Sequence, residues 1–383
     1  MTSARASILA VLLFAAAGCT STSPSVTAAD KPASQAASPA AEPSIDYANA
    51  RITVAGVGDI MLGTDYPENH LPDDDGENFL TAVTPVLASA DITFGNLEGV
   101  LQDGGEPAKE CKNPKACYLF RSPVRYAQHL KAAGFDVLSL ANNHARDFGE
   151  EGRDSSMTAL DAVGIRHSGR VGDIAQWQQG ELRIALIAFS PTIDSWQLLE
   201  IDTATEEVRK LAESNDIIIV SFHGGAEGFD GAERIGFGME YAYGEQRGNV
   251  VAFSRGVIDA GADLVLGHGP HVPRAMELYR ERLIAYSLGN FANYYGISVK
   301  GAKGYAPILK VSMDGYGRFL DGKLHSNIQI RPGGPIPDSA QHALKMIRQL
   351  TAEDFPGGNL IFDGNGDIKI SEHQHAERES VHE

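Results

Sequence analysis

Short apolar runs alternate with amphipathic stretches from residue 51 to residue 350. Seven of these runs have the length of β-strands, namely Arg51–Val57, Asp91–Phe94, Phe135–Leu140, Leu182–Phe189, Asp216–Phe222, Ala262–Leu266 and Arg282–Leu288. Helical periodicity predicts helices between them, over Phe79–Ala88, Pro123–Ala133, Ser155–Val163, Thr203–Ser214 and Asn249–Ala260. Strands that alternate with helices in this way predict an α/β protein.

The last part of the chain departs from this alternation. Ala306–Met313 and Lys323–Arg331 have the pattern of antiparallel strands joined by a turn at 314–317, and Ser339–Leu350 is the last predicted helix. Because short turns join the later strands, the sheet is not expected to be purely parallel. Two sheets flanked by helices fit this order of elements.

A short polar cluster follows each of six strand-like runs. The clusters are Gly58–Gly63, Gly95–Gly99, Ala141–Asp147, His223–Glu227, Gly267–His271 and Tyr286–Phe291. Because the carboxyl ends of strands in α/β folds converge on one rim, these clusters are expected to meet. Their carboxylates, amides and imidazoles are ligands of the divalent metals that carry out hydrolysis. The pattern therefore predicts a dispersed metal site.

The best single metal signal is the pair His268 and His271, which brackets a Gly-Pro turn and can face one metal ion or two. The other clusters also have structural readings. Asp59 is typical of an Asx-turn or a helix cap, and Glu98 of a carboxylate that caps a neighbouring helix. His223 alone would read as a histidine at the edge of a core. The metal reading depends on the clusters acting together.

The first 48 residues carry signals of export. Residues 6–18 are a largely apolar run of 13 residues, too short to cross a bilayer, that ends in small residues before Cys19. We interpret residues 1–19 as a signal peptide with a lipobox-like Cys19, which is lipidated. The alternative is an ordinary secreted protein cleaved near Ala17. Residues 20–48 are rich in Ser, Thr, Ala and Pro and are expected to be a flexible linker.

The expected location is therefore outside the cytoplasm, as a lipoprotein anchored to a membrane at the periplasmic or outer cell-surface side. We divide the rest of the chain into a domain over 49–335, an extension over 336–370 packed on it, and a disordered tail over 371–383. Cys111 and Cys117 enclose a short polar loop and are expected to form a disulfide in an exported chain. A metal-binding pair is the alternative, but it lacks further Cys or His ligands nearby.

The formal net charge of −18 argues against nucleic acid as a partner, because the sequence contains no basic stripe to neutralise phosphates. The same charge disfavours electrostatic docking on anionic lipid.

In combination, four clusters resemble those of the CapA family, bacterial proteins tied to synthesis of the poly-γ-glutamate capsule. They are Gly58–Gly63, Asn96–Glu98, Ala141–Gly149 and Tyr286–Phe291. The resemblance runs from about residue 53 to residue 291. That family is related in fold to the calcineurin-like metallophosphoesterases. The resemblance therefore implies an α/β fold of one particular kind, the four-layer αββα sandwich of the metallo-dependent phosphatase type.

The resemblance also implies one or two divalent metal ions, and mixed oxygen and nitrogen ligands fit Mn, Fe or Zn. The implied ligands are Asp59, Glu98, Asn143, His223, His268 and His271. Three side chains have implied catalytic roles. His144 would handle the proton of a leaving group, Asp147 would fix the tautomer of that imidazole, and Glu98 would bridge two metal ions or act as an acid or base.

Three further residues are candidate substrate contacts, namely Arg121, Glu227 and Asn290. Arg121 is a candidate anion clamp, and a solvated surface arginine is an equally good reading. The chain also departs from the related patterns. Met61 stands where metallophosphoesterases carry an imidazole ligand. Gly224 and Gly228 replace aromatic residues that are frequent in the CapA family.

The implied function is a role in capsule or poly-γ-glutamate biosynthesis, as a metal-dependent hydrolase or transferase that acts on an anionic polymer. The implied partners are the polymer, membrane-bound subunits of a polymer synthase, and the membrane through the lipid anchor. Met61 keeps a second hypothesis open, a non-catalytic lipoprotein with a degenerate metal site that binds the polymer or the synthase. A third hypothesis is a metallophosphoesterase, since a fold alone does not fix a reaction.

Overall fold

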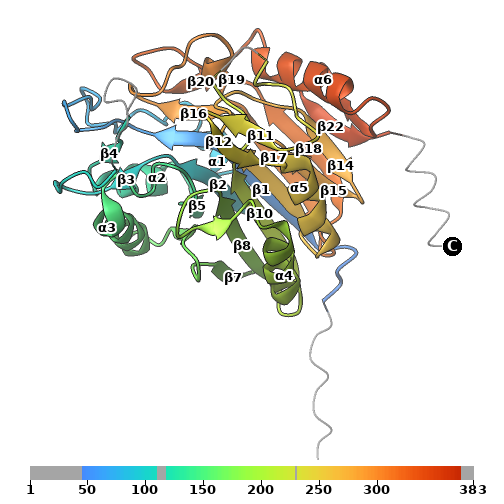
Figure 1. The fold of residues 1–383 in the computed structure, drawn as a ribbon. Coiled ribbons are helices and arrows are strands. Elements are labelled where there is room, and N and C mark those ends of the chain that lie inside the picture. Colours follow the sequence, from blue (N-terminus) through green and yellow to red (C-terminus); the bar gives the residue numbers. More distant parts are fainter. Residues whose placement is uncertain (1–44, 110–117, 229–230, 372–383) are drawn as a thin grey trace, which may run out of the picture. The chain divides into compact units, whose positions relative to one another are not determined.

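The computed structural model describes residues 45–109, 118–228 and 231–371. Within these residues two β-sheets pack face to face, and helices cover the outer face of each sheet (Figure 1). The order of the layers is helices, sheet, sheet and helices. The predicted α/β class and the four-layer αββα sandwich are therefore confirmed.

The first sheet has the strand order β21-β22-β18-β17-β1-β2-β5-β6, and β16 also pairs with β1. The strands of this sheet are β1 Arg51–Met61, β2 Ile92–Leu97, β5 Val137–Ser139, β6 Arg166–Ser168, β16 Asn290–Asn293, β17 Ile308–Asp314, β18 Phe319–His325, β21 Leu360–Phe362 and β22 Asp367–Ile370. Strands β1, β2, β5 and β6 are parallel, whereas β17 runs antiparallel to β1. The sheet is mixed, as the short turns between the later strands predict.

The second sheet has the strand order β14-β15-β13-β10-β8-β7, and β9 also pairs with β8. The strands of this sheet are β7 Ala175–Gln179, β8 Leu182–Ser190, β9 Trp196–Gln197, β10 Ile217–His223, β13 Leu264–His268, β14 Met276–Tyr279 and β15 Arg282–Ala285. The central strands β8, β10, β13 and β15 are parallel. Every residue of β10 is buried, because both faces of this strand are covered. This explains its continuous apolar sequence.

The helices cover the two outer faces of the sheets, except for α6, which closes an edge of the sandwich. They are α1 Thr84–Leu87, α2 Tyr126–Ala132, α3 Gly149–Ala162, α4 Ile201–Ala212, α5 Val250–Asp259 and α6 His342–Asp354, with a short 3₁₀ helix η2 over Gly301–Gly304. Helices α1, α2 and α3 share a core with the first sheet, and α4 and α5 share one with the second. A third core fills the space between the sheets and includes Val54 and Ile219. Burial of each such side chain contributes about 1.5–3 kcal/mol.

Several predicted boundaries were wrong. Only Thr84–Leu87 of the predicted helix Phe79–Ala88 is helical, because Pro85 lacks an amide hydrogen and fits only the first turn of a helix. Helix α3 begins at Gly149 rather than Ser155. The spacing of apolar residues does not reveal its first turn, because that turn is polar. Glu150 and Glu151 in this turn do favour a helix N-terminus.

The predicted strand Lys323–Arg331 is two strands. Strand β18 ends at His325, and β19 Asn327–Gln329 turns away to pair with β20 Pro335–Pro337. The short pair β3 Val100–Leu101 and β4 Arg121–Ser122 and the hairpin of β11 Glu240–Ala242 and β12 Glu245–Gly248 complete the strands. Helix α6, β21 and β22 close one edge of the sandwich, and Leu344 and Ile347 of α6 enter the core between the sheets.

Three groups of predictions lie outside the described residues. They are the lipidation site Cys19 with its signal peptide and the linker up to residue 44, the disulfide pair Cys111 and Cys117, and the disordered tail from residue 372 onward. Among the residues that the structure does describe, no helix combines the length and the apolar character that crossing a bilayer requires.

Candidate metal centre

The ends of strands from both sheets bring the polar clusters together. In the first sheet, Asp59 of β1 lies beside Asn96 of β2 on one side and beside Asn290 of β16 on the other. In the second sheet, His223 at the end of β10 lies beside His268 at the end of β13. The convergence that the sequence predicts for these strand ends is therefore present.

A glycine permits the close approach of two chain segments at this point. A Cβ atom on Gly58 would lie 2.0 Å from the carbonyl oxygen of Gly289. With glycine there, the amide of Asp59 donates a hydrogen bond of 2.9 Å to that oxygen. Residue 58 must therefore be glycine for the Asp59 and Asn290 segments to meet.

Three predicted ligands form the centre of the site. Asp59, Glu98 and His223 each offer one ligand atom, and these atoms all lie within 4.8 Å of one another. All three side chains are buried. Burial, followed by the charge of Asp59, raises the pKa of Glu98 to about 8. Burial, followed by the charge of Arg247, lowers the pKa of His223 well below its ordinary value.

Asn96 connects these groups, although no separate role was predicted for it. Its Nδ2 donates to Asp59 Oδ1 at 2.8 Å and to Glu98 Oε2 at 2.7 Å, and lies 3.5 Å from His223 Nδ1. Its Oδ1 accepts a hydrogen bond of 3.1 Å from Asn142. One amide therefore orients two carboxylates, and a second amide orients the first. The sequence did contain a signal for Asn96, because this residue lies in the same polar cluster as Glu98.

The buried polar atoms test whether a metal ion fits this site. Among the described residues, four such atoms of predicted ligands have no hydrogen-bond partner, namely Glu98 Oε1, Asn143 Oδ1, His223 Nε2 and His268 Nδ1. A buried polar atom without a partner costs about 1–3 kcal/mol, so four in one place need an explanation. All four can coordinate a cation, and this mixture of oxygen and nitrogen donors fits Mn, Fe or Zn. The residues therefore fit a divalent metal ion.

The tautomer of His268 agrees with this assignment. Its Nε2 lies 3.0 Å from the carbonyl oxygen of Val57, which can only accept, so Nε2 carries the hydrogen and donates. The lone pair is then on Nδ1, the atom without a partner. Histidines that bind metal commonly donate their other ring nitrogen to a carbonyl in this way.

His271 is charged where it meets Asp59. Its Nδ1 lies 2.8 Å from Asp59 Oδ2 and 3.1 Å from Asn290 Oδ1. Burial lowers the pKa of His271, but the hydrogen bond and charge of Asp59 outweigh burial and raise it to about 9. Burial raises the pKa of Asp59, but the same contact holds it below its ordinary value. Because the Asn290 amide donates to backbone carbonyls, its Oδ1 faces His271 and orients that ring.

His144 and Asp147 form a second pair beside the centre. His144 Nδ1 donates to Asp147 Oδ2 at 2.7 Å, so the lone pair of the neutral ring is on Nε2, which lies 4.0 Å from Glu98 Oε1. Burial lowers the pKa of His144 against the opposing charge of Asp147. The buried Asp147 also accepts from Lys109 Nζ at 3.0 Å and from the Phe120 amide at 2.9 Å. The His144 ring is thus fixed in one orientation.

Met61 has an apolar role. Its side chain is buried against Phe120 and Ile297. The Phe120 ring lies 4.3 Å from the ring of His144, measured between centroids. The thioether that replaces an imidazole ligand therefore supports the aromatic ring on which His144 rests.

Arg121 is occupied by partners of its own. Its Nε contacts Asp65 Oδ1 at 2.6 Å, and its Nη1 donates to the Gly105 carbonyl at 2.8 Å. Its guanidinium also lies over the rings of Tyr66 and Phe148. This placement favours a structural arginine and does not support the predicted anion clamp.

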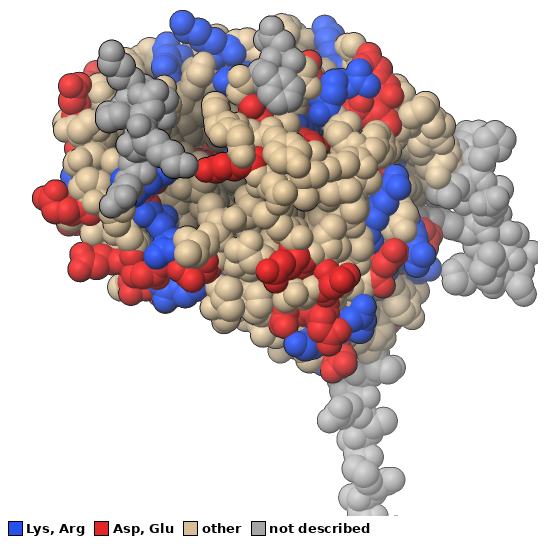
Figure 2. All heavy atoms as spheres, viewed as in Figure 1, with Lys and Arg blue, Asp and Glu red and all other residues tan. Residues whose placement is uncertain are grey.

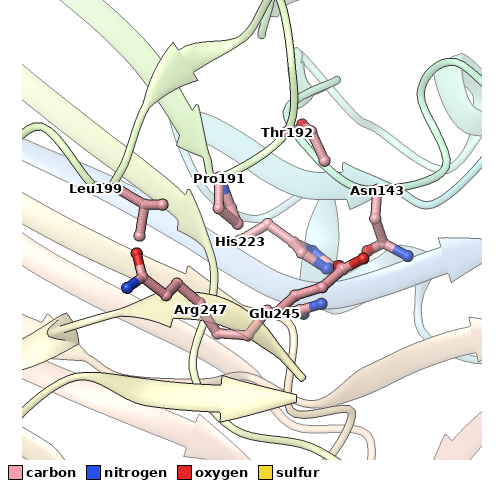
Figure 3. A pocket seen from close by; sticks show the side chains of 8 residues that line it. Asn143, Pro191, Thr192, Leu199, His223, Glu245 and Arg247 are labelled. Atoms are coloured by element: carbon pink, nitrogen blue, oxygen red, sulfur yellow. The ribbon is translucent and has the colours of Figure 1, made fainter. Parts of the chain in front are cut away.

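A cavity of about 490 Å³ adjoins the centre (Figure 3). The residues that line it are Asn143, Pro191, Thr192, Leu199, His223, Glu245, Gln246 and Arg247. Arg247 was missed from the sequence because no strand-like apolar run precedes it. Gly244 could have indicated the turn of the hairpin that carries Arg247, since glycine is frequent in such turns. Its Nη2 contacts Glu227 Oε2 at 3.1 Å, and the same oxygen lies 3.8 Å from His271 Nε2.

Replacing Asn96 with Ala is expected to weaken metal binding by about 10–100-fold, since a side chain that orients metal ligands has an effect of this size. Titration of the metal-free protein with Mn or Zn by calorimetry measures the change. Asn215→Ala is the control, because Asn215 is equally an amide of low exposure but bonds to Leu211 and Gln176. Equal affinities for wild type and Asn96→Ala would contradict the orienting role.

Similarity to solved structures is distant. The chain is 13% identical to a putative 5′-nucleotidase from Staphylococcus aureus, with a TM-score of 0.41 over 79% of this chain and 58% of that one. The 5′-nucleotidase precursor from Thermus thermophilus gives 13% identity and a TM-score of 0.38 over 78% of this chain and 58% of that one. The chain thus spans less than two thirds of both structures.

Similarity in sequence extends over much more of the relatives. The chain is 27% identical to the capsule biosynthesis protein CapA of Bacillus anthracis, over 81% of this chain and 75% of that protein. It is 28% identical to the PGA biosynthesis protein CapA of Bacillus subtilis, over 83% of each. A probable polyglutamine synthesis accessory protein of Mycobacterium tuberculosis is 30% identical over 54% of this chain and 57% of that protein.

The family described as bacterial capsule synthesis protein PGA_cap matches residues 53–295, which include every predicted ligand and the His144–Asp147 pair. Since the match covers more than half of the chain, the chain belongs to this family of capsule synthesis proteins.

Proposed function

We propose that this protein acts in the synthesis of an anionic capsule polymer of the poly-γ-glutamate type, as a metal-dependent hydrolase or transferase. The observation that carries the proposal is the buried group of Asp59, Glu98 and His223 within 4.8 Å, with unpartnered ligand atoms next to His144. The family and the names of the relatives support the choice of polymer.

The residues that would hold the metal are Asp59, Glu98, Asn143, His223, His268 and His271. A bound divalent cation supplies a Lewis acid that polarises an oxygen of the substrate. The contribution of the protein is to fix the ligands and to limit access of bulk water, since Asp59, Glu98, His223 and His268 are buried.

The proton chemistry belongs to His144. Its Nδ1 hydrogen is committed to Asp147, so a proton is taken up and released at Nε2. Cleavage or transfer of an amide requires a proton for the leaving amine. Because burial lowers the pKa of His144, Nε2 would take a proton from the attacking water or amine and pass it to the leaving amine. Asp147 stabilises the charged ring between these two events.

The proposal is tested on purified protein loaded with Mn, Fe or Zn and incubated with poly-γ-glutamate. Each cleaved amide bond releases one primary amine, which an amine-reactive dye counts, while gel filtration follows the length of the polymer. A chelator-treated sample is the control. Amine release only with metal is the expected result. Binding of the polymer with neither amine release nor a change in polymer length under any metal would favour the non-catalytic alternative.

The metallophosphoesterase alternative is tested in parallel with a chromogenic phosphate monoester and the same metal series. Phosphate release that greatly exceeds amine release would replace the proposed reaction with phosphate ester cleavage.

We also propose that the protein is exported and held at a membrane by a lipid on Cys19. Replacing Cys19 with Ser is expected to move the protein from the membrane fraction to the soluble fraction, because the thiol that would carry the lipid is lost. Cell fractionation and the mass of the mature N-terminus measure this. A wild-type protein that is already soluble and cut elsewhere would contradict the anchor.

A further inference from the structure

The hairpin of β11 and β12 is fixed next to the metal centre by a buried ion pair. Glu240 on β11 accepts from Arg274 Nη1 at 2.9 and 3.2 Å, and its Oε2 also accepts from the Ala226 amide at 2.6 Å. Both charged side chains are buried. Breaking a buried, hydrogen-bonded ion pair is costly, so this contact fixes the base of the hairpin.

Arg247 projects from this hairpin into the cavity beside the centre. Its own carbonyl accepts a hydrogen bond of 2.8 Å from the Gly225 amide, which ties β12 to the segment after β10. Its side chain is only 5% exposed and lines the cavity together with His223 and Asn143 (Figure 3). A group bound to Arg247 would therefore lie next to two predicted metal ligands.

Not every N–H donor of the Arg247 guanidinium has a hydrogen-bond acceptor among the described residues. Its Nη2 contacts Glu227 Oε2 at 3.1 Å and the Gly269 carbonyl at 3.4 Å, which is long for a hydrogen bond. Its Nε is buried and has no partner among the described residues. A guanidinium has five N–H donors in a fork that matches a carboxylate. Here the Nε hydrogen has no acceptor among the described residues.

The charges around the cavity favour a singly charged anion. Of the described residues that line it, Arg247 is the one with a permanent positive charge, and Glu245 is also part of the lining. Glu227 lies against the guanidinium. A second negative charge on the group bound to Arg247 would meet these carboxylates, and no second arginine or lysine among the described lining residues would offset it. Charged residues of both signs lie around the rim of the face in Figure 2, and its centre is mostly uncharged.

We propose that Arg247 is the residue that recognises a carboxylate of the substrate, in the cavity beside the metal centre. The inference rests on the proposed function, because it names the contact that selects an anionic polymer at the same site. Arg247 takes the role that the sequence suggested for Arg121, whose guanidinium is already held by Asp65 and the Gly105 carbonyl.

The test measures binding rather than turnover. A short γ-linked glutamate oligomer and the same oligomer with its carboxylates amidated are titrated by calorimetry into the full chain. Wild type is expected to prefer the charged oligomer. Arg247→Gln is expected to weaken binding of the charged oligomer by about 10–100-fold, the effect of losing charge-assisted hydrogen bonds, and to leave the amidated oligomer unchanged. Arg247→Lys keeps the charge without the fork and is expected to be intermediate.

Arg209→Gln is the matched control. It removes the same charge from an exposed side chain of α4, which pairs only with Glu206 three residues away. It is expected to bind both oligomers as wild type does. Metal content and melting temperature are measured for every variant, so that a loss of structure is recognised.

Three outcomes would overturn the inference. The first is an unchanged affinity of Arg247→Gln for the charged oligomer, and the second is an equal loss of affinity for both oligomers. The third is that inorganic phosphate displaces the oligomer from wild type but not from Arg247→Gln. The inference and the proposed function can fail separately. Discrimination by Arg247 without any amine release would end the proposed reaction only, whereas amine release with unchanged discrimination in Arg247→Gln would end the role of Arg247 only.

Discussion

His144→Ala is expected to lower the rate of amine release from poly-γ-glutamate by about 10²–10⁴-fold and to leave the bound metal unchanged, since a positioned acid or base has an effect of this size. The reason is the geometry of the ring. Asp147 holds Nδ1 at 2.7 Å, and Nε2 faces Glu98 Oε1 at 4.0 Å. Removing the ring removes the atom that carries the proton but none of the three clustered ligands.

The measurement compares turnover with metal content in the same preparation. Asp147→Asn is a second variant that keeps the shape of the side chain but weakens the support of His144, and it is expected to reduce turnover in the same direction. His342→Ala is the control, because that imidazole lies on α6 and contacts Asp338. Loss of metal in His144→Ala would identify the ring as a ligand, and full turnover would remove it from the reaction.

His223→Ala is expected to weaken metal binding by more than about 100-fold. Loss of a residue that only orients ligands costs about 10–100-fold, so loss of a ligand should cost more. His223 Nε2 is buried without a partner, and the ring lies 3.5 Å from Glu98 Oε2 through its other nitrogen. Metal content after dialysis against buffer measures the loss directly.

Thermal unfolding gives an independent readout of the same change. A ligand at 100 times its Kd stabilises the folded state by about 2.7 kcal/mol, so metal is expected to raise the Tm of wild type. The shift should disappear in His223→Ala and persist in His325→Ala, which changes a histidine on β18, two strands away from β1 in the first sheet. A Tm that responds equally to metal in both variants would contradict the assignment.

The central strands were predictable because they are buried on both faces. The run Ile-Ile-Ile-Val of β10 can only be a covered strand or a buried helix, and the polar cluster directly after it indicates its end. The short edge strands β6, β7 and β14 were missed, because three to five residues with mixed burial carry little periodicity. Helix α1 was too long in the prediction because apolar spacing does not register the position of Pro85.

The metal centre was predictable in its ligands and not in its connections. Asp59, Glu98 and His223 stand directly after apolar runs, so the topology of the sheets alone brings them together. Arg247 reaches the centre only because Glu240 docks on Arg274, which is a contact between distant parts of the chain. The placement of Arg121 could not be predicted either, since its partner Asp65 lies 56 positions away in the sequence. No local pattern contains such pairings.

The candidate ligands of one centre come from two sheets, and this would tie metal loading to assembly of the fold. Asp59 lies in β1 and Glu98 follows β2 in the first sheet, whereas His223 and His268 end strands of the second. Neither sheet alone presents a complete set of donors. A cation bound by all four side chains would link the two sheets at one end of the apolar core between them. Metal binding would then distinguish folded from incompletely folded protein, because only a chain whose two sheets are correctly packed can retain the ion.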